Sequence, residues 1–258
     1  MSDVEQKTYL ITGGGSGIGR AIIIKLAESG ARIITCGRRQ SLLEETASIC
    51  RTLPGAVQII TADLTRRDDL EVVVDAVLDR GSGRLDGLVN NAGIVMPDMF
   101  PEWSDDCLDH LLETNLRVPI RLVQKVWPGL LQARGRIVNL SSLAVQWPFP
   151  RNGAYGITKS ALDGLTRAIH VEAVGTGIKA FSIALGAVET PMLRRLVDKT
   201  MLPTHKAMHP SEAAAIVNAC LLGERDHDAG KVLYAAIPGL VTSNADQAET
   251  ALALFNGT

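Results

Sequence analysis

The chain has 258 residues, of which 46% are hydrophobic, and its 26 basic and 28 acidic residues give a formal net charge of −2. This length and composition predict a single domain over residues 1–258 with a large core. The scattered, nearly balanced charge favours neither a nucleic acid nor an anionic membrane as partner. No apolar run approaches the roughly 18 residues that a membrane-spanning helix requires.

The start of the chain and the cysteines suggest where the protein works. Residues 1–6 are acidic and polar, unlike a secretory signal or an Arg-rich transit peptide. The four cysteines are far apart, without a CxxC pair or a histidine at metal-ligand spacing: Cys36, Cys50, Cys107 and Cys220. We therefore expect free thiols, no metal site and a cytoplasmic protein.

Short apolar runs alternate with helical patterns along the whole chain. The expected strands cover residues 8–12, 31–36, 57–62, 85–90, 136–140, 178–183 and 231–235. The expected helices cover residues 18–29, 40–53, 66–80, 104–133, 154–175 and 211–222. Near-continuous apolar strands separated by helices predict a doubly wound, Rossmann-like α/β fold, in which about seven parallel strands have helices on both faces.

Residues 186–210 do not fit this alternation. They contain Gly186 and three prolines, at positions 191, 203 and 210, among apolar and basic residues. Connections of this length in a compact domain usually have a function. We predict that this segment is a lid over the substrate.

The first expected strand leads into a glycine-rich turn, TGGGSGIG, over residues 12–19. Glycines allow a tight turn and a close approach to a pyrophosphate, and the N-terminus of the following helix offers free N–H groups. We expect the phosphates of a dinucleotide to bind at Gly13, Gly15, Ser16, Gly17, Ile18 and Gly19.

The end of the second strand indicates which dinucleotide binds. NAD-binding proteins of this fold have an acidic residue there for the ribose 2′-hydroxyl, but this chain has Arg38 and Arg39. A guanidinium binds a 2′-phosphate through two parallel hydrogen bonds. The alternative is that both arginines cap a solvated turn. We favour NADP over NAD, although Ser16 adds no positive charge.

The ends of the third and fourth strands offer further cofactor contacts. Asp63, followed by Leu64, can accept a hydrogen bond from the adenine amino group or cap the next helix, and the two roles are compatible. Residues 90–93 read Asn-Asn-Ala-Gly, which allows the adenosine half to approach closely. We expect Asn90 to brace the neighbouring backbone and Ala92 and Gly93 to lie beside the cofactor.

Acid–base chemistry is predicted at the fifth strand and the helix after it. Tyr155 and Lys159 lie four residues apart and therefore share one helix face. A nearby ammonium lowers the pKa of a phenol from about 10 toward the working range. Ser142, at the end of the fifth strand, can hold a substrate oxygen against the Tyr155 hydroxyl. Each feature alone is common, but ligands of open α/β sheets bind where these strand ends meet.

Taken together, these motifs resemble the short-chain dehydrogenase/reductase family over essentially the whole chain. Residues 12–19 match its TGxxxGxG motif, residues 90–93 its NNAG motif, and Tyr155 with Lys159 its YxxxK motif. Asn115 and Ser142 fall where the family has its asparagine and serine. The resemblance implies an NAD(P)-dependent oxidoreductase that moves a hydride between nicotinamide and a carbonyl or secondary alcohol.

The resemblance also implies a role for each of these four residues. Tyr155 would be the general acid/base, and Lys159 would bind the nicotinamide ribose and lower the pKa of Tyr155. Ser142 would orient the carbonyl, and Asn115 would support a water that relays protons to Lys159. Family members commonly form dimers or tetramers, so a homo-oligomer, such as a homotetramer, is implied.

One position departs from the family pattern. After the sixth strand the family usually has Pro-Gly, whereas this chain has Leu185 and Gly186. Proline fixes φ and lacks an N–H, so Leu185 frees the backbone at this point and leaves the path of the lid open. We still expect Gly186, Val188 and Thr190 to contact the nicotinamide end.

The substrate pocket is expected to be lined by residues that follow strands four, five and six: Val95, Leu143, Trp147, Asn152 and Met192. This mostly apolar lining suits an apolar or aromatic ketone, aldehyde or secondary alcohol. The alternative for Trp147 is a packing or subunit contact.

Carbonyl reduction has three alternatives as the function of this chain. They are an NAD-dependent alcohol dehydrogenase that works oxidatively, a non-catalytic dinucleotide-binding regulator, and a sugar-nucleotide epimerase or dehydratase. The complete set of Asn115, Ser142, Tyr155 and Lys159 argues against the regulator. An epimerase would need a larger C-terminal substrate domain than the sequence has room for.

Overall fold

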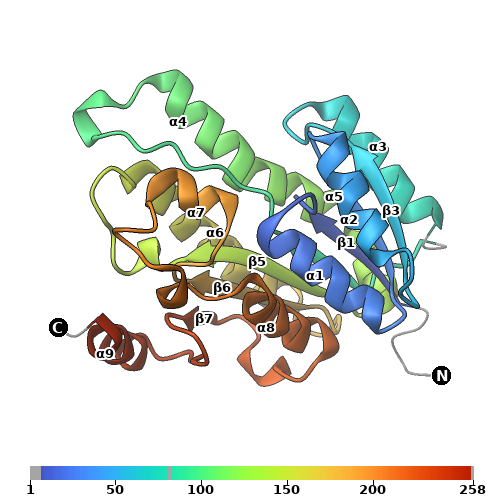
Figure 1. The fold of residues 1–258 in the computed structure, drawn as a ribbon. Coiled ribbons are helices and arrows are strands. Elements are labelled where there is room, and N and C mark those ends of the chain that lie inside the picture. Colours follow the sequence, from blue (N-terminus) through green and yellow to red (C-terminus); the bar gives the residue numbers. More distant parts are fainter. Residues whose placement is uncertain (1–6, 81–82, 257–258) are drawn as a thin grey trace.

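A seven-stranded parallel sheet forms the centre of the protein, seen in a computed structural model that describes residues 7–80 and 83–256 (Figure 1). In chain order the strands are β1 (Thr8–Thr12), β2 (Arg32–Gly37), β3 (Ala56–Thr61), β4 (Gly87–Asn90), β5 (Arg136–Ser142), β6 (Lys179–Leu185) and β7 (Val232–Ala235). Their order in space is β3-β2-β1-β4-β5-β6-β7, so the predicted doubly wound fold is confirmed.

Helices follow the strands and cover both faces of the sheet. They are α1 (Gly17–Glu28), α2 (Gln40–Cys50), α3 (Arg67–Arg80), α4 (Asp105–Leu112), α5 (Val118–Ala133), α6 (Gly153–Glu172), α7 (Pro191–Leu196), α8 (Pro210–Leu222) and α9 (Ala245–Asn256). The helix predicted over 104–133 is divided into α4, a π-helical turn over Glu113–Arg117, and α5. Such wide turns are frequent at functional sites.

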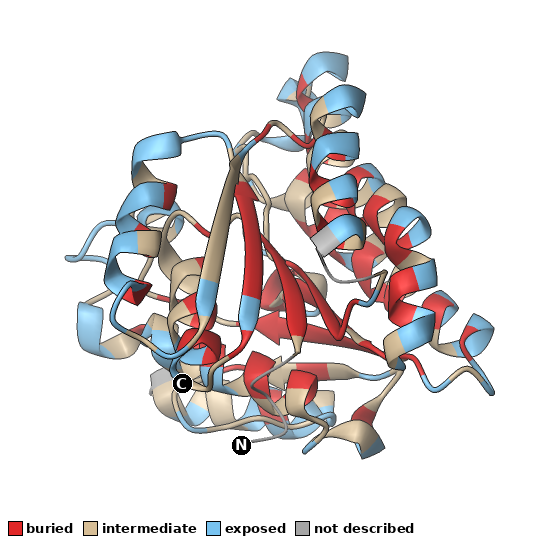
Figure 2. Ribbon diagram, turned by 90° about the vertical axis from the view of Figure 1, so that its right-hand side faces the viewer, coloured by how far each residue is buried: buried red, intermediate tan, exposed pale blue. Residues whose placement is uncertain are grey.

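Two hydrophobic cores, one on each face, hold the helices to the sheet. Successive residues of β1 alternate between them, since Tyr9 and Ile11 pack in the core under α1 and α8, while Leu10 packs in the core under α3, α5 and α6. The central strands are buried along their length and the helices expose their outer surfaces (Figure 2). This double burial explains why the strands are near-continuous apolar runs in the sequence.

The sheet changes winding direction between β1 and β4. The chain runs outward from β1 to β2 and β3, then returns to the other side of β1 and continues outward through β4 to β7. Ligands of this fold bind at the carboxyl ends of the strands beside such a switch point. The glycine turn after β1 and the asparagine turn after β4 meet there.

The segment 186–210 folds back on itself. Its two ends are joined by a parallel bridge between Val188 and Met208, in which Glu189 N donates to Met208 O at 2.9 Å and Met208 N donates to Ala187 O at 2.8 Å. Helix α7 lies within the segment, where the sequence patterns predicted no helix.

Helix α9 is a further element that the sequence patterns did not predict. Asn244 Oδ1 accepts hydrogen bonds from the backbone N–H groups of Asp246 and Gln247 at 2.9 and 3.3 Å and so caps its first turn. An asparagine before an alanine-rich run is a recognisable start signal. Among the helices that the structure describes, none has both the length and the apolar character needed to span a membrane.

Candidate active site

The glycine turn between β1 and α1 forms a cradle at the switch point. Gly13 and Gly17 have φ values of +73° and +55°, in the left-handed region that favours glycine. A Cβ on Gly19 would lie 2.4 Å from the Gly13 carbonyl oxygen, so the turn closes too tightly for any side chain there. A backbone cradle at a helix N-terminus fits a pyrophosphate.

Asn91 braces this turn. Its side-chain Nδ2 donates to the carbonyl oxygens of Thr12 and Gly13 at 2.7 and 3.1 Å. In return, Thr12 Oγ1 accepts from the backbone N–H groups of Asn91 and Ala92 at 3.1 and 2.9 Å. The bracing role expected for Asn90 was therefore assigned to the wrong asparagine.

Asn90 points into the sheet instead. Its Nδ2 donates to Asn139 Oδ1 at 2.8 Å, and Asn139 Nδ2 donates to Thr166 Oγ1 at 2.8 Å, which links β4, β5 and α6. All three residues are buried. The sequence could have predicted that Asn90 and Asn91 point in different directions, because side chains of successive residues in an extended chain face opposite sides.

A second set of contacts holds the glycine turn from the side of α2, and the sequence analysis missed it. Arg20 Nη2 donates to Gly15 O at 2.6 Å, and Arg20 Nε donates to Thr46 Oγ1 at 3.0 Å. Thr46 Oγ1 lies 2.9 Å from Gly14 O, and Glu45 pairs with Arg20 at 2.8 Å. With its carbonyls bound from behind, the turn is held in one shape.

Arg38 and Arg39 lie at the end of β2, and both side chains are exposed. Neither guanidinium forms a hydrogen bond or ion pair with another described residue. Asp63 lies across from them: burial acts to raise its pKa, but hydrogen bonds from Thr65 and the charge of Arg38 outweigh this and lower it. Asp63 Oδ1 accepts from Thr65 N and Oγ1, so the carboxylate closes the turn before α3, which begins at Arg67, and does not bind the first turn of that helix.

The Ser142 and Tyr155 hydroxyls meet at the carboxyl edge of the sheet. Ser142 is the last residue of β5, and its Oγ accepts from Ala144 N at 3.2 Å. Tyr155 is in the first turn of α6. Burial raises its pKa, while the hydrogen bond with Ser142 acts in the opposite direction.

Lys159 lies one helical turn after Tyr155 and is only 5% exposed. Its Nζ donates to Leu140 O at 2.7 Å and lies 5.6 Å from the centroid of the Tyr155 ring. Burial lowers the pKa of Lys159 to about 8, against the opposing effect of Asp163. In this arrangement burial sets the direction of the Tyr155 pKa, and the Lys159 ammonium is held by Leu140 O. A lowering of the Tyr155 pKa by Lys159 stays a prediction.

Asn115 lies in the π-helical turn and joins the β4 loop to α6. Its Oδ1 accepts from Ile94 N at 2.8 Å, and its Nδ2 donates to Ile94 O at 2.9 Å and to Thr158 Oγ1 at 3.0 Å. A Cβ on Gly93 would lie 3.3 Å from Asn115 Oδ1 and 3.5 Å from Lys159 Nζ. The Asn115 amide and the Lys159 ammonium therefore face the same space beside Gly93.

The residues after β6 reach back to the glycine turn. Thr190 Cγ2 lies 3.0 Å from the position of a Cβ on Gly17, and Thr190 Oγ1 accepts from Leu193 N to cap α7. A Cβ on Gly186 would lie 2.5 Å from Ala236 O, which explains a glycine there. The Val188 side chain packs in the core, so only its backbone is available to a ligand.

Arg194 holds the segment 186–210 together. Its Nε donates to Glu189 Oε1 at 2.8 Å, a second hydrogen bond joins its Nη2 to Glu189 Oε2, and its Nη1 donates to Leu202 O at 2.8 Å. The guanidinium is thus fully engaged, whereas the neighbouring Arg195 is exposed.

The structure separates the five predicted pocket residues into two groups. Leu143 and Trp147 pack with β7 and α9, and the Trp147 ring contacts Tyr234 with centroids 6.1 Å apart. For Trp147 the packing alternative applies. Val95, Asn152 and Met192, which follow β4, β5 and β6 in the chain, remain at least partly exposed.

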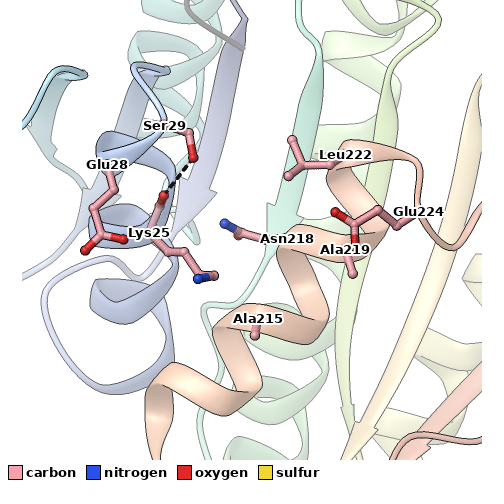
Figure 3. A pocket seen from close by; sticks show the side chains of 8 residues that line it. All are labelled: Lys25, Glu28, Ser29, Ala215, Asn218, Ala219, Leu222 and Glu224. Carbon is pink, nitrogen blue, oxygen red and sulfur yellow. Dashed lines mark hydrogen bonds between the residues drawn. The ribbon is translucent and has the colours of Figure 1, made fainter. Parts of the chain in front are cut away.

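A hollow of about 370 Å³ lies elsewhere, between α1 and α8 (Figure 3). Lys25, Glu28 and Glu224 bring charge of both signs to it, and Asn218 points toward it from α8. It is at the C-terminal ends of these helices and therefore at the opposite edge of the sheet from Ser142 and Tyr155. None of the predicted site residues lines it.

Comparison with known proteins identifies the family. The family model described as short chain dehydrogenase matches residues 7–201. The chain belongs to the short-chain dehydrogenase/reductase family. It is therefore an NAD(P)-dependent oxidoreductase that binds a dinucleotide and acts on a small molecule, and the non-catalytic alternative is set aside.

Several family members resemble the chain over most of its length. A 3-oxoacyl-(acyl-carrier-protein) reductase from Thermotoga maritima is 30% identical over 237 residues, which are 89% of this chain and 96% of the relative. An L-fucose dehydrogenase from Bos taurus is 34% identical, covering 77% and 72%. The crystal structure of a 3-ketoacyl-(acyl-carrier-protein) reductase from Brucella melitensis complexed with NADH has a TM-score of 0.82 at 26% identity, covering 90% and 97%.

Proposed function

We propose that this short-chain dehydrogenase/reductase uses NADPH to reduce a ketone or aldehyde of a small, apolar or aromatic substrate. The observation that supports this reaction best is the contact between the Ser142 and Tyr155 hydroxyls, with Lys159 one helical turn away. The three groups lie at the carboxyl edge of the sheet, beside the glycine cradle.

The residues around the glycine turn fit the dinucleotide. Its phosphates would lie on the backbone of Gly13, Gly15, Ser16, Ile18 and Gly19, with Gly17 completing the turn against Thr190. Ala92, Gly93 and the backbone of Gly186 and Val188 would flank it, and Asp63 and Leu64 would meet its adenine. When bound, the nicotinamide supplies the hydride to the carbonyl carbon.

The chain itself supplies the proton and holds the carbonyl. Ser142 Oγ donates a hydrogen bond to the carbonyl oxygen and fixes it next to the Tyr155 hydroxyl, which donates its proton as the alcohol forms. Lys159 Nζ, which donates to Leu140 O in this structure, would bind the ribose hydroxyls of the nicotinamide half. Asn115 keeps the β4 loop against α6, and through this placement supports the water that returns a proton to Lys159.

The preference for NADP rests on the end of β2. Arg38 and Arg39 are exposed, and neither forms an ion pair with a described side chain. Both lie where the 2′-position of the adenosine ribose is bound in this fold. A free guanidinium favours a 2′-phosphate over a hydroxyl. The alternative is NAD-dependent alcohol oxidation. The NADH complex of the Brucella reductase supports NAD as a possible cofactor and says nothing of the oxidative direction.

Cofactor fluorescence titration tests this preference. NADPH and NADH are titrated into the wild type, Arg38→Ala and a control, Arg51→Ala, which removes an exposed arginine at the other end of α2. We expect tighter binding of NADPH and a loss of about tenfold in its affinity for Arg38→Ala alone. Preference for NADH, or equal affinities in wild type and Arg38→Ala, would overturn the assignment.

The remaining expectations concern the substrate and the assembly. We propose that the segment 186–210 is the substrate lid, with Met192, Val95 and Asn152 facing the substrate. We also propose a homo-oligomer, dimer or tetramer, and a cytoplasmic location, which the four buried free thiols support. Analytical ultracentrifugation of the purified protein tests the assembly.

A further inference from the structure

Helix α6 carries a buried carboxylate that the proposed chemistry does not use. Asp163 lies one helical turn after Lys159 and is 5% exposed. It accepts hydrogen bonds from the hydroxyls of Ser182 on β6 and Ser141 on β5. Two neutral hydroxyls satisfy its oxygens but do not balance its charge, so a buried carboxylate here needs a nearby cation.

Lys159 is the buried cation that faces it. Both side chains are on the inner face of α6, since residues four apart share a face, and both are 5% exposed. Lys159 Nζ has a neutral partner, Leu140 O, and none of the described carboxylates lies within ion-pair distance of it. In a poorly solvated environment, two opposite charges one turn apart stabilise each other without direct contact.

The other charged and titratable groups around Asp163 are few. Arg167 lies one turn further along α6 and adds a favourable charge, and Tyr234 faces Asp163 from β7. Burial raises the pKa of Asp163, opposed in order by Ser182, Ser141, Arg167 and Lys159. On the side of Lys159, Asp163 opposes the lowering of the lysine pKa by burial.

We propose that Asp163 is a positioning residue that acts through Lys159: its carboxylate, anchored by Ser141 and Ser182, keeps the Lys159 ammonium charged in its buried site. The inference rests on the proposed function of Tyr155 and Lys159. A charged Lys159 is what stabilises a Tyr155 phenolate and binds ribose hydroxyls. A neutral amine at this position would not stabilise the phenolate and would bind the ribose hydroxyls more weakly.

The alternative is a purely structural carboxylate that links α6 to β5 and β6. The two roles differ in whether the charge matters. Asp163→Asn keeps the shape and one hydrogen-bond acceptor but removes the charge. Asp163→Glu keeps the charge, and Asp86→Asn removes a carboxylate of similar burial, 6% exposed, at the opposite edge of the sheet.

The titration of Lys159 is measured directly by NMR of protein labelled with ¹³C at lysine Cε, with the Lys159 signal assigned by its loss in Lys159→Arg. We expect Asp163→Asn to lower the midpoint of the Lys159 titration by about one pH unit. Asp163→Glu and Asp86→Asn are expected to leave it within about 0.3 unit of wild type, since a charge near Lys159 is kept in both. Asp163→Ser, which puts a neutral hydroxyl in place of the carboxylate, replaces Asp163→Asn if that variant does not fold.

The pH profile of alcohol oxidation gives the second readout. Once the Lys159 amine is neutral, the phenolate loses its cation, so kcat/KM of Asp163→Asn should fall about fivefold at pH 8 if the midpoint drops by one unit from about 8. An unchanged Lys159 midpoint in Asp163→Asn would overturn the inference, even in an active enzyme. A lowered midpoint in a chain that has no oxidoreductase activity would uphold the electrostatic coupling and instead overturn the proposed function.

Discussion

Lys159 Nζ donates a hydrogen bond to the Leu140 carbonyl oxygen at 2.7 Å, and the same ammonium lies 5.6 Å from the centre of the Tyr155 ring. Burial moves the pKa values of these two groups in opposite directions, that of Tyr155 upward and that of Lys159 down to about 8. Each group is thereby biased toward its neutral form. Burying Lys159 as an ammonium lowers the stability of the folded protein, and Tyr155 is the proposed proton donor; both effects can be measured.

The cost appears as a dependence of stability on pH. An unfolded lysine has a pKa of about 10.4, whereas the folded value for Lys159 is about 8. Between these values the unfolded chain binds more protons, so the free energy of unfolding contributed by Lys159 rises with pH. We expect Lys159→Met to be more stable than wild type at pH 7, by up to about 3 kcal/mol less the lost hydrogen bond.

Urea unfolding of both proteins at pH 7, 8.5 and 10 measures this difference. The advantage of Lys159→Met should shrink steadily as the pH rises through that window, because the folded wild type no longer has to bury a charge. A difference that is independent of pH would show that Lys159 is not held in a poorly solvated site.

Tyr155→Phe tests the proton chemistry. It removes the hydroxyl that meets Ser142 and leaves the ring and the helix in place. We expect kcat to fall by about 10²- to 10⁴-fold, as for other lost general acids, with the affinity for cofactor changed less than about threefold. Steady-state rates and cofactor titration are the measurements. A variant that retains most of its rate would exclude Tyr155 as the acid/base.

Arg20→Ala tests the contacts by which Arg20, on α1, ties the glycine turn to Thr46 and Glu45 on α2. Arg20 binds Gly15 O, Thr46 and Glu45, so its loss frees the turn to adopt other shapes and adds an ordering cost to cofactor binding. We expect the cofactor Kd to rise about tenfold, a loss of roughly 1.4 kcal/mol. Lys25→Ala, at the far end of the same helix, is the control and should bind cofactor like wild type.

Arg194→Ala tests the segment 186–210 as a substrate lid. Arg194 joins Glu189 to the carbonyl oxygen of Leu202, and without it the segment loses its internal ties. We expect KM for the substrate to rise about fivefold or more while the cofactor Kd stays near that of wild type. Arg195→Ala is the matched control, because Arg195 is adjacent but exposed. Equal KM values for the two variants would count against a lid.

The sequence was sufficient for the elements whose pattern is local. Each predicted strand is present, because double burial makes these strands continuous apolar runs, and the glycine and asparagine turns lie at the strand ends where they were expected. The Tyr155 and Lys159 pairing also follows from helix spacing alone. In these places the chain neighbourhood determines the structure.

What the sequence did not show depends on distant partners. In the sequence Arg20 looks like an ordinary surface residue, and only the fold brings Thr46 and Glu45 of α2 to it. Likewise, Trp147 packs on Tyr234 of β7, which is far away along the chain. Helix spacing places Lys159 one turn from Tyr155, and this neighbour alone predicts a lowered pKa for Tyr155. Burial, which raises it, depends on the packing of the whole molecule.

The bridge between Val188 and Met208 brings the two ends of a twenty-residue excursion to the same place beside the sheet. A stretch of chain that departs and returns at one point behaves as an exchangeable cassette, because changes in its length or sequence need not be transmitted to the strands that support it. If the segment is the proposed substrate lid, specificity can therefore diversify within it while Thr190, which packs on Gly17, is kept and the dinucleotide cradle keeps its geometry. Grafting residues 192–207 from a relative with a different substrate would be the natural way to give this scaffold another selectivity.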